Sequence, residues 1–215
     1  MLALIEKYGY ETVDQAGRAL ISQSEELLRL RIAELPRGQW QSRQYMDVQG
    51  KTLKVCISMT NNGEELIFDF SGSSPQSDRP INCTKASCIG GVLAPVFPLL
   101  CYDIIWNEGV IRCVKVIAPE GSVVSCARPA PVSVATIGAI QAVRIAASAT
   151  LSKMLAASDK YRKEASALWH ANSFAIFLFG RNQHGRRVIG ILTETFGGAT
   201  GARTFADGID VILPP

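Results

Sequence analysis

The hydrophobic pattern of the first part of the chain is helical. Thr12 and Gln15 have the spacing of a capping box, in which two side chains cap each other's backbone at a helix start. Apolar residues then recur three or four positions apart, as on one face of a helix, until Pro36 ends the pattern. The sequence predicts a helix over residues 12–35, with an apolar stripe of Ala16, Leu20, Leu27, Leu28 and Leu35.

The period changes to two between residues 39 and 70, which is typical of strands. Side chains alternate over residues 39–45, and a second alternating run covers residues 53–59. Asn62 and Gly63 are a strong hairpin signal, because both tolerate the positive φ angles of a tight turn. Residues 66–70 then form the return strand. We expect an antiparallel meander of about three strands.

The middle of the chain mixes helix and strand signals. Residues 83–103 are apolar and rich in small residues, which indicates a helix, and Pro95 and Pro98 predict a break in it. Residues 107–109 have the composition of a turn, and residues 110–117 that of a strand.

A turn and a long helix follow. At residues 118–122, proline and glycine occupy positions that type I turns favour. The next pattern predicts a helix over residues 133–157, whose small residues let another helix approach closely. These small residues, three or four positions apart, are Gly138, Ala142, Ala146 and Ala149.

The last part of the chain is rich in strands. Residues 173–179 and 188–195 are predicted to form a hairpin, and a Gly-rich loop follows at residues 196–201. The predicted fold class is α+β, with mixed, mainly antiparallel β meanders packed with a few long helices. We divide the chain into residues 1–130 (capped helix, meander and Ser/Gly loop) and 131–215 (long helix, hairpin and Gly loop), in one continuous unit.

Charge and composition narrow the classes of function. The 22 basic and 19 acidic residues nearly cancel, and no run of Lys or Arg is long enough for a nucleic-acid surface. The most apolar stretch, residues 132–155, is interrupted by Gln141, Arg144 and Lys153, so it predicts a packed helix and no membrane span. The amino terminus lacks the apolar core of a signal peptide, and the six cysteines form no Cys-x-x-Cys pair. We expect buried, reduced thiols and a cytoplasmic protein.

Candidate chemistry is concentrated in two loops that follow strands. Asp69 stands before the Ser/Gly loop of residues 71–76, whose hydroxyl and N–H groups can hold a polar ligand or fix a domain junction. Glu194 stands before a loop in which Gly197 and Gly198 permit close approach to an anion or to another chain segment. Alternatively, each carboxylate has a purely structural role, in which it accepts hydrogen bonds from the N–H groups of its own loop. The two histidines are far apart in sequence, and we expect no metal site within the chain.

Several short motifs follow one another in a fixed order. They are AELPRG at 33–38, FDFSGSSPQ at 68–76, RPIN at 79–82, NEG at 107–109, VKVIAPEGS at 114–122, ETFGGATGA at 194–202 and DG at 207–208. In this order they resemble the later half of the hydantoinase B/oxoprolinase family. That family includes subunits of ATP-dependent hydantoinases, oxoprolinases and lactamases, and of acetone and acetophenone carboxylases.

The chain departs from the family pattern in three ways. Family subunits are usually much longer, and their amino-terminal motifs with His and Asp, which are associated with a metal, have no match here. They also continue beyond the position of Pro215. Where many members have a helix start that resembles Asn-x-Glu-Thr-Ser-Gln-Arg, this chain matches only at Gln141 and Arg144, which is closer to the carboxylase branches.

The resemblance implies a segment of a hydantoinase B-like subunit in a multi-subunit enzyme. A hydantoinase A-like partner would use ATP to phosphorylate a carbonyl or amide oxygen, and the B-like subunit would complete hydrolysis of a cyclic amide or carboxylation of a ketone. ATP with Mg and a divalent metal, zinc or manganese, are expected elsewhere in the complex. The residues expected to line the cavity are Asp69, Ser71, Asn82, Glu194, Gly197, Gly198 and Asp207.

The alternative is a non-catalytic scaffold or interface module of such a complex. In that case the small-residue helix at residues 133–157 would pack against the missing half of the subunit or against another subunit. Under either hypothesis the isolated chain is expected to be inactive.

Overall fold

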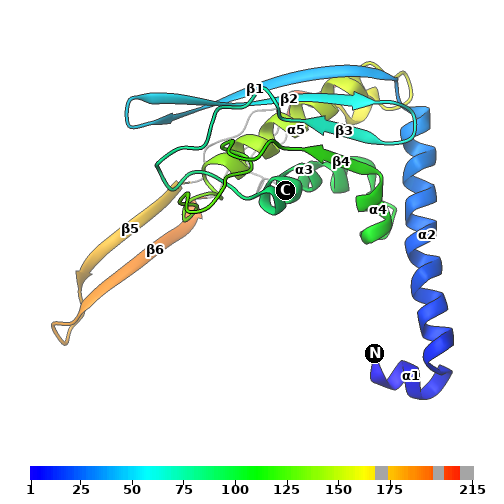
Figure 1. Cartoon of the computed structure of the whole chain (residues 1–215), viewed down its shortest axis with the longest axis horizontal. Coiled ribbons are helices and arrows are strands. Elements are labelled where there is room, and N and C mark those ends of the chain that lie inside the picture. Colours follow the sequence, from blue (N-terminus) through cyan, green and yellow to red (C-terminus); the bar gives the residue numbers. More distant parts are fainter. Residues whose placement is uncertain (168–173, 196–200, 209–215) are drawn as a thin grey trace.

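A four-stranded sheet forms the centre of the computed structural model (Figure 1), which describes residues 1–167, 174–195 and 201–208. The three strands of the predicted meander pair antiparallel, and the fourth strand joins the third in parallel. Helices pack on the sheet, so the predicted α+β class with mainly antiparallel pairing is confirmed. The strands, in sheet order, are β1 (Gly38–Val48), β2 (Lys51–Asn61), β3 (Leu66–Asp69) and β4 (Val114–Ile117).

The two faces of this sheet have different surroundings. Along β2, Val55, Ile57 and Met59 are buried, whereas Cys56 and Ser58 between them are half-buried on the opposite face. Helix α5 (Ala139–Ala156) packs across β1 and β2 on the buried face, and α3 (Lys85–Leu100) packs against α5. The period-two pattern of the sequence therefore separates a core face from a polar outer face.

The close helix approach predicted from the small residues of α5 occurs within the chain. The helix begins at Ala139 and not at residue 133, since residues 134–138 form successive hydrogen-bonded turns. Where α3 crosses α5, a Cβ atom on Gly91 would lie 2.9 Å from Cγ1 of Val143. The glycine thus allows the two helices to touch.

The first helical region differs from the prediction at its start. It consists of α1 (Leu2–Tyr8) and α2 (Tyr10–Glu34), separated by Gly9 with a φ of 81°. Thr12 lies inside α2, so the predicted capping box is wrong, because the helix starts before it. The predicted apolar stripe also divides, because Leu28 is buried whereas Leu20 and Leu27 are exposed. Figure 1 shows α2 projecting from the body with α1 at its far end.

Two corrections concern the middle of the chain. Pro95 and Pro98 both lie inside α3, so the predicted helix break is wrong. Each proline removes one backbone hydrogen bond, but the helix is held by the burial of residues such as Val92 and Val96 against its neighbours. The strand predicted over residues 110–117 is also too long.

The first part of the strand predicted over residues 110–117 belongs instead to helix α4 (Glu108–Arg112), which precedes β4. The Asn107 side chain caps this helix by accepting a hydrogen bond from the N–H of Gly109 at 2.8 Å. A Cβ atom on Gly109 would lie 2.0 Å from the carbonyl oxygen of Ile21, so α4 lies directly against the α2 backbone. This tertiary contact explains the helical turn where the local sequence favours a strand.

The predicted hairpin near the end of the chain is confirmed. It comprises β5 (Phe174–Arg181) and β6 (Arg187–Thr195), which pair antiparallel as a separate two-stranded sheet. A 3₁₀ turn, η1 (Arg162–Glu164), precedes it. Figure 1 shows the hairpin and α2 leaving the body at opposite ends and toward the same side. In the described part of the chain, no helix is both long and apolar enough to cross a membrane.

The cysteines behave as small apolar residues of the core. All six are free, and Cys83, Cys88, Cys101 and Cys113 are buried. Burial raises the pKa of the Cys83 and Cys101 thiols to about 12 and that of Cys113 to about 11. A raised thiol pKa means that the nucleophilic thiolate is scarce at neutral pH. These thiols are therefore packing groups.

The contact between α3 and α5 predicts opposite effects for two adjacent glycines. Gly91→Ala should destabilise the fold by roughly 1–3 kcal/mol, because its methyl group must displace the stiff side chain of Val143. Gly90→Ala is the matched control: no atom lies within 4 Å of its added Cβ, so alanine should stabilise the helix by about 0.5–1 kcal/mol. Urea unfolding of both variants measures the difference, and equal stabilities would contradict this packing.

Burial of the thiols predicts selective labelling. At pH 8 a thiol with a pKa of about 12 is ionised in only about one molecule in ten thousand, and the fold also shields it. A small disulfide reagent should therefore label the half-buried Cys56 and Cys126 first, and the other four only after denaturation. Peptide mapping after timed labelling checks this. Rapid labelling of Cys88 in the folded chain would contradict the structure.

Candidate functional site

The Ser/Gly loop continues the sheet where β3 ends. Ser73 and Ser74 lie along β2 and use their hydroxyl groups as well as their backbone. Ser74 Oγ accepts from the N–H of Lys54 at 3.0 Å, and Ser73 Oγ accepts from the N–H of Cys56 at 3.1 Å. The N–H of Ser74 also donates to the carbonyl of Lys54 at 2.9 Å. Two side-chain oxygens and one backbone N–H thus take the place of a paired strand along this part of β2.

Asp69 begins this loop with a local turn. It is the last residue of β3, and its Oδ1 accepts from the N–H of Ser71 at 2.8 Å and from the Ser71 hydroxyl at 2.6 Å. Its register partner on β2 is Ser58, whose partner on β1 is Gln41. Side chains that are paired in register point to the same face of a sheet. Asp69 therefore lies on the polar outer face.

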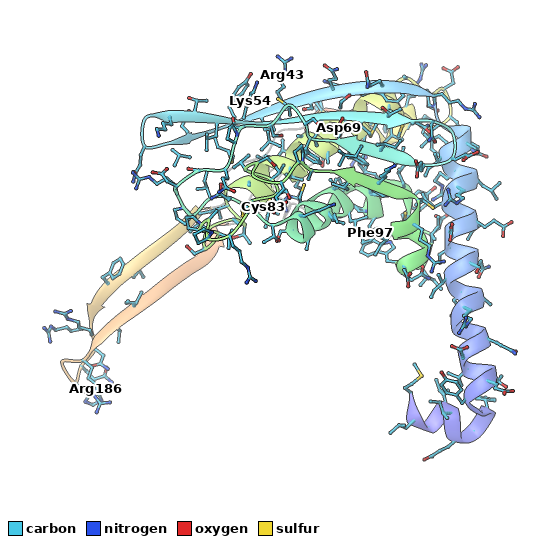
Figure 2. The ribbon with its side chains drawn as sticks, viewed as in Figure 1. Arg43, Lys54, Asp69, Cys83, Phe97 and Arg186 are labelled. Atoms are coloured by element: carbon cyan, nitrogen blue, oxygen red, sulfur yellow. The ribbon has the colours of Figure 1, made fainter. Side chains whose placement is uncertain are left out.

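A pocket of about 230 Å3 opens on this outer face. Asp69, Ser71 and Gly72 form one side, and β1 and β2 contribute Arg43 and Lys54 among other residues. Figure 2 labels Arg43 on β1, Lys54 on β2 and Asp69 at the end of β3, and the strand register places all three on the outer face. Two cations and one carboxylate around a small volume suit a polar ligand with an anionic group.

One polar atom beside the pocket has an unmet hydrogen-bonding capacity. Within the described residues, Ser58 Oγ is the buried side-chain oxygen without a hydrogen-bond partner. The residue lines the pocket between Gln41 and Asp69. Unpaired buried hydroxyls are uncommon in native structures, because each costs about 1–3 kcal/mol. The outer face thus carries a hydroxyl group whose hydrogen-bonding capacity no other described residue uses.

The segment that follows the Ser/Gly loop is held by a buried asparagine. Asn82 is fully buried, and its amide donates to the carbonyls of Ser77, Arg79 and Pro131, each at 2.9 Å. Its Oδ1 accepts from the N–H of Ser77 at 2.7 Å. Asn82 therefore lies in the interior of the segment of residues 77–82 that follows the Ser/Gly loop, and its contacts hold that segment in shape.

A second segment braces the loop from the side. Gln76 donates its N–H to Gly121 and accepts from the N–H of Ala127 through its side chain, both at 2.8 Å. The turn predicted at residues 118–122 begins one residue later, because Ser122 donates to the carbonyl of Pro119. The end of the loop at Gln76 is therefore anchored to the segment of residues 121–127.

The structure brings together only part of the predicted set. Asp69 and Ser71 share the pocket, and Asp207 is exposed on residues 201–208. The side chain of Glu194, together with Gly197 and Gly198, lies outside the described residues. Their role in a site stays a prediction.

Sequence reasoning missed the contribution of β1 and β2 to the pocket. Arg43 and Lys54 were not among the predicted site residues, because neither stands in a motif. A signal was present, however: Gln41 and Arg43 fall on one face of the alternating pattern, and the hairpin register sets that face opposite Ser58 and Cys56.

The described residues do not form a metal centre. No group of three or more His, Cys, Asp or Glu side chains converges in these parts of the chain. His184 is exposed on the β5–β6 hairpin. Within residues 1–167, 174–195 and 201–208, no set of side chains therefore fits a divalent metal.

The relatives of this chain are long proteins of which it matches a part. Over 144 residues it is 29% identical to the putative B subunit of a D-/L-hydantoinase from Pseudomonas sp. strain NS671, and the match covers 60% of this chain and 24% of that protein. An uncharacterized protein of Methanocaldococcus jannaschii is 27% identical over 143 residues, or 66% of this chain and 25% of its own length. The chain thus spans about a quarter of these relatives.

Two solved structures share the fold. The ATP-dependent caprolactamase of Pseudomonas jessenii matches 99% of this chain with a TM-score of 0.79 and 19% identity, over 36% of its own chain. A nucleotide-free acetone carboxylase matches 96% of this chain with a TM-score of 0.85 and 18% identity, over 29% of its chain. Residues 1–214 match the hydantoinase B/oxoprolinase family, and the chain belongs to that family.

Proposed function

We propose that this chain is a segment of a hydantoinase B-like subunit in an ATP-dependent, multi-subunit enzyme that hydrolyses a cyclic amide or carboxylates a ketone. The observation that carries the proposal is the family match over residues 1–214. The shared fold with an ATP-dependent caprolactamase and with an acetone carboxylase supports both reaction types.

Activation by ATP has a clear chemical reason. An amide carbonyl resists attack by water, and its oxygen is a poor leaving group. Transfer of a phosphoryl group to that oxygen makes the carbon electrophilic enough for water to add, after which the C–N bond breaks and a second water releases inorganic phosphate from the resulting acyl phosphate. For a ketone, the same transfer traps the enol form as an enol phosphate, and cleavage of its P–O bond releases inorganic phosphate and the enolate that attacks carbon dioxide. In this proposal a hydantoinase A-like partner performs the transfer, and the B-like subunit receives the activated reactant.

The outer-face pocket is proposed as one wall of a composite site. A phosphorylated reactant or a carboxylate product is anionic, and Arg43 and Lys54 supply positive charge beside the pocket. Asp69 and Ser71 supply an acceptor and a hydroxyl on the opposite side. ATP with Mg and any divalent metal would come from outside this chain, and no step through a metal is assigned to its residues.

A scaffold or interface module is the second candidate. It is favoured by the large apolar residues that the two projecting elements expose, such as Leu27 and Leu30 on α2 and Phe179 and Ile189 on the hairpin. In a scaffold, the pocket residues would matter for assembly and not for turnover.

The test of the proposed function compares two aspartates in the assembled complex. Asp69→Ala should lower ATP-dependent turnover of cyclic amides, or of acetone with bicarbonate, by about tenfold or more. That is the effect of losing one hydrogen bond to a charged group, about 1.5–3 kcal/mol. Asp47→Ala, on the same sheet and outside the pocket, should leave turnover unchanged.

The measurement is release of inorganic phosphate together with product, with assembly followed by size-exclusion chromatography. Wild-type turnover by assembled Asp69→Ala would mean that the loop serves only as a turn. Loss of assembly with retained specific activity would favour the scaffold. Turnover by the isolated chain would refute the need for a partner.

A further inference from the structure

The charged groups around the outer-face pocket do not pair with one another. Arg43, Lys54 and Asp69 all line this pocket. Yet none of the three belongs to a salt bridge among the residues that the structure describes. The hydrogen bonds that Asp69 accepts come from Ser71, within its own turn. Opposite charges that share a small volume without contact leave both signs available to a ligand.

The register of the sheet separates the two signs. Asp69 on β3 is opposite Ser58 on β2, and Arg43 on β1 is opposite Cys56, two residues further along β2. Because strands are about 4.8 Å apart and rise about 3.4 Å per residue, the Cα atoms of Asp69 and Arg43 are about 12 Å apart. Lys54 lies two residues beyond Cys56 on the same face. The negative charge therefore belongs to one end of the pocket and the positive charges to the other.

The floor between the two ends is polar. Ser58 Oγ has no hydrogen-bond partner among the described residues. Since no hydrogen bond holds its present rotamer, rotation about χ1 can turn the hydroxyl group toward a ligand. Cys56 lies beside Ser58 and against the loop, because a Cβ atom on Gly72 would be 3.2 Å from Cβ of Cys56. Its thiol can therefore report whether the pocket is occupied.

The volume and the charges together define the ligand. A volume of about 230 Å3 is that of roughly eight water molecules at about 30 Å3 each, which limits the ligand to a small molecule. An anionic group at one end and an ammonium group at the other would satisfy both ends of the pocket. A phosphate group would bring a second anion beside Asp69. A keto acid would present a carbonyl oxygen to Asp69, and a carboxylate has no proton to donate to it.

We propose that the outer-face pocket binds a short amino acid, with its carboxylate at Arg43 and Lys54 and its ammonium group at Asp69. This inference rests on the proposed function and decides between its two reactions. Hydrolysis of a cyclic amide adds water across the C–N bond, so its product carries a carboxylate and an amine in one molecule. Carboxylation of a ketone forms a C–C bond and yields a keto acid, which has no N–H group. The charges of the pocket therefore favour the hydrolytic reaction.

The test compares three ligands on the full chain, purified with the subunits that accompany it. Calorimetric titration uses 5-aminopentanoate, 4-oxopentanoate and inorganic phosphate. The first two share a chain length and a carboxylate, and they differ in the amine. We expect 5-aminopentanoate to bind at least tenfold more tightly than 4-oxopentanoate. Equal or tighter binding of the keto acid would overturn the proposal.

Timed labelling of cysteines shows where the ligand binds. Saturating 5-aminopentanoate should slow the reaction of Cys56 with a small disulfide reagent at least fivefold. Cys126, which is also half-buried but lies outside the pocket, is the control in the same molecule and should react at an unchanged rate. Stronger protection of Cys56 by phosphate than by the amino acid would overturn the proposal. So would equal slowing of both thiols, no slowing, or a Cys56 that stays unlabelled without ligand.

Two substitutions separate the ends of the ligand. Asp69→Asn removes the charge but keeps an oxygen for the N–H of Ser71, so the turn is retained. It should weaken binding of 5-aminopentanoate at least tenfold without weakening that of 4-oxopentanoate, whereas Arg43→Gln should weaken both. Asp47→Asn, on the same face of β1 and outside the pocket, is the matched control and should weaken neither. Equal losses of both ligands in Asp69→Asn would mean that Asp69 only supports the loop.

The two proposals can fail separately. If the complex hydrolyses cyclic amides with ATP but the pocket does not prefer the amino acid, the ligand is wrong and the function stands. If the complex carboxylates ketones and leaves cyclic amides intact, the same conclusion holds. If the pocket selects the amino acid but the complex shows no ATP-dependent turnover, the function is wrong and the binding site stands.

Discussion

The packing of α5 against the sheet is the contact on which the rest of the structure depends. At its start, the N–H of Ala139 donates to the carbonyl of Ile81, in the segment that follows the Ser/Gly loop. Near its end, the ammonium group of Lys153 donates to the carbonyl of Gln41 on β1. One helix therefore positions both the loop and the strand between which the pocket opens.

The outer-face pocket results from this support. Strand alternation sends the core residues of β2 toward α5 and leaves the intervening positions, such as Ser58, for the opposite face. The end of β3 and the start of the loop add Asp69 and Ser71 beside them, and Gln76 anchors the far end of the loop by accepting a hydrogen bond from Ala127. A ligand would meet groups that are already ordered, so binding would spend little free energy on ordering them.

The sequence predicts this structure best where local patterns and tertiary packing agree. The alternation in residues 39–70 and the pair Asn62 and Gly63 gave the meander, because pleat and turn geometry are local properties. The α3 prolines and the strand before Val114 gave wrong expectations, because burial against neighbouring elements outweighed local propensity. The Thr12 capping box was wrong because α2 starts earlier, directly after Gly9. To predict that Arg43 and Lys54 line the pocket, one needs the register between strands, which no single motif contains.

The hydroxyl groups of Ser73 and Ser74 also limit strand pairing between copies of this protein. β3 covers only residues 58–61 of β2, and an uncovered strand edge is a template for pairing with another chain. Ser73 and Ser74 occupy the N–H groups of Lys54 and Cys56 with side-chain oxygens, and the N–H of Ser74 occupies the carbonyl of Lys54, so these groups of the β2 edge are not free to pair with another chain. The Ser/Gly loop, which lines the outer-face pocket, therefore also protects the edge of β2 from pairing with another chain.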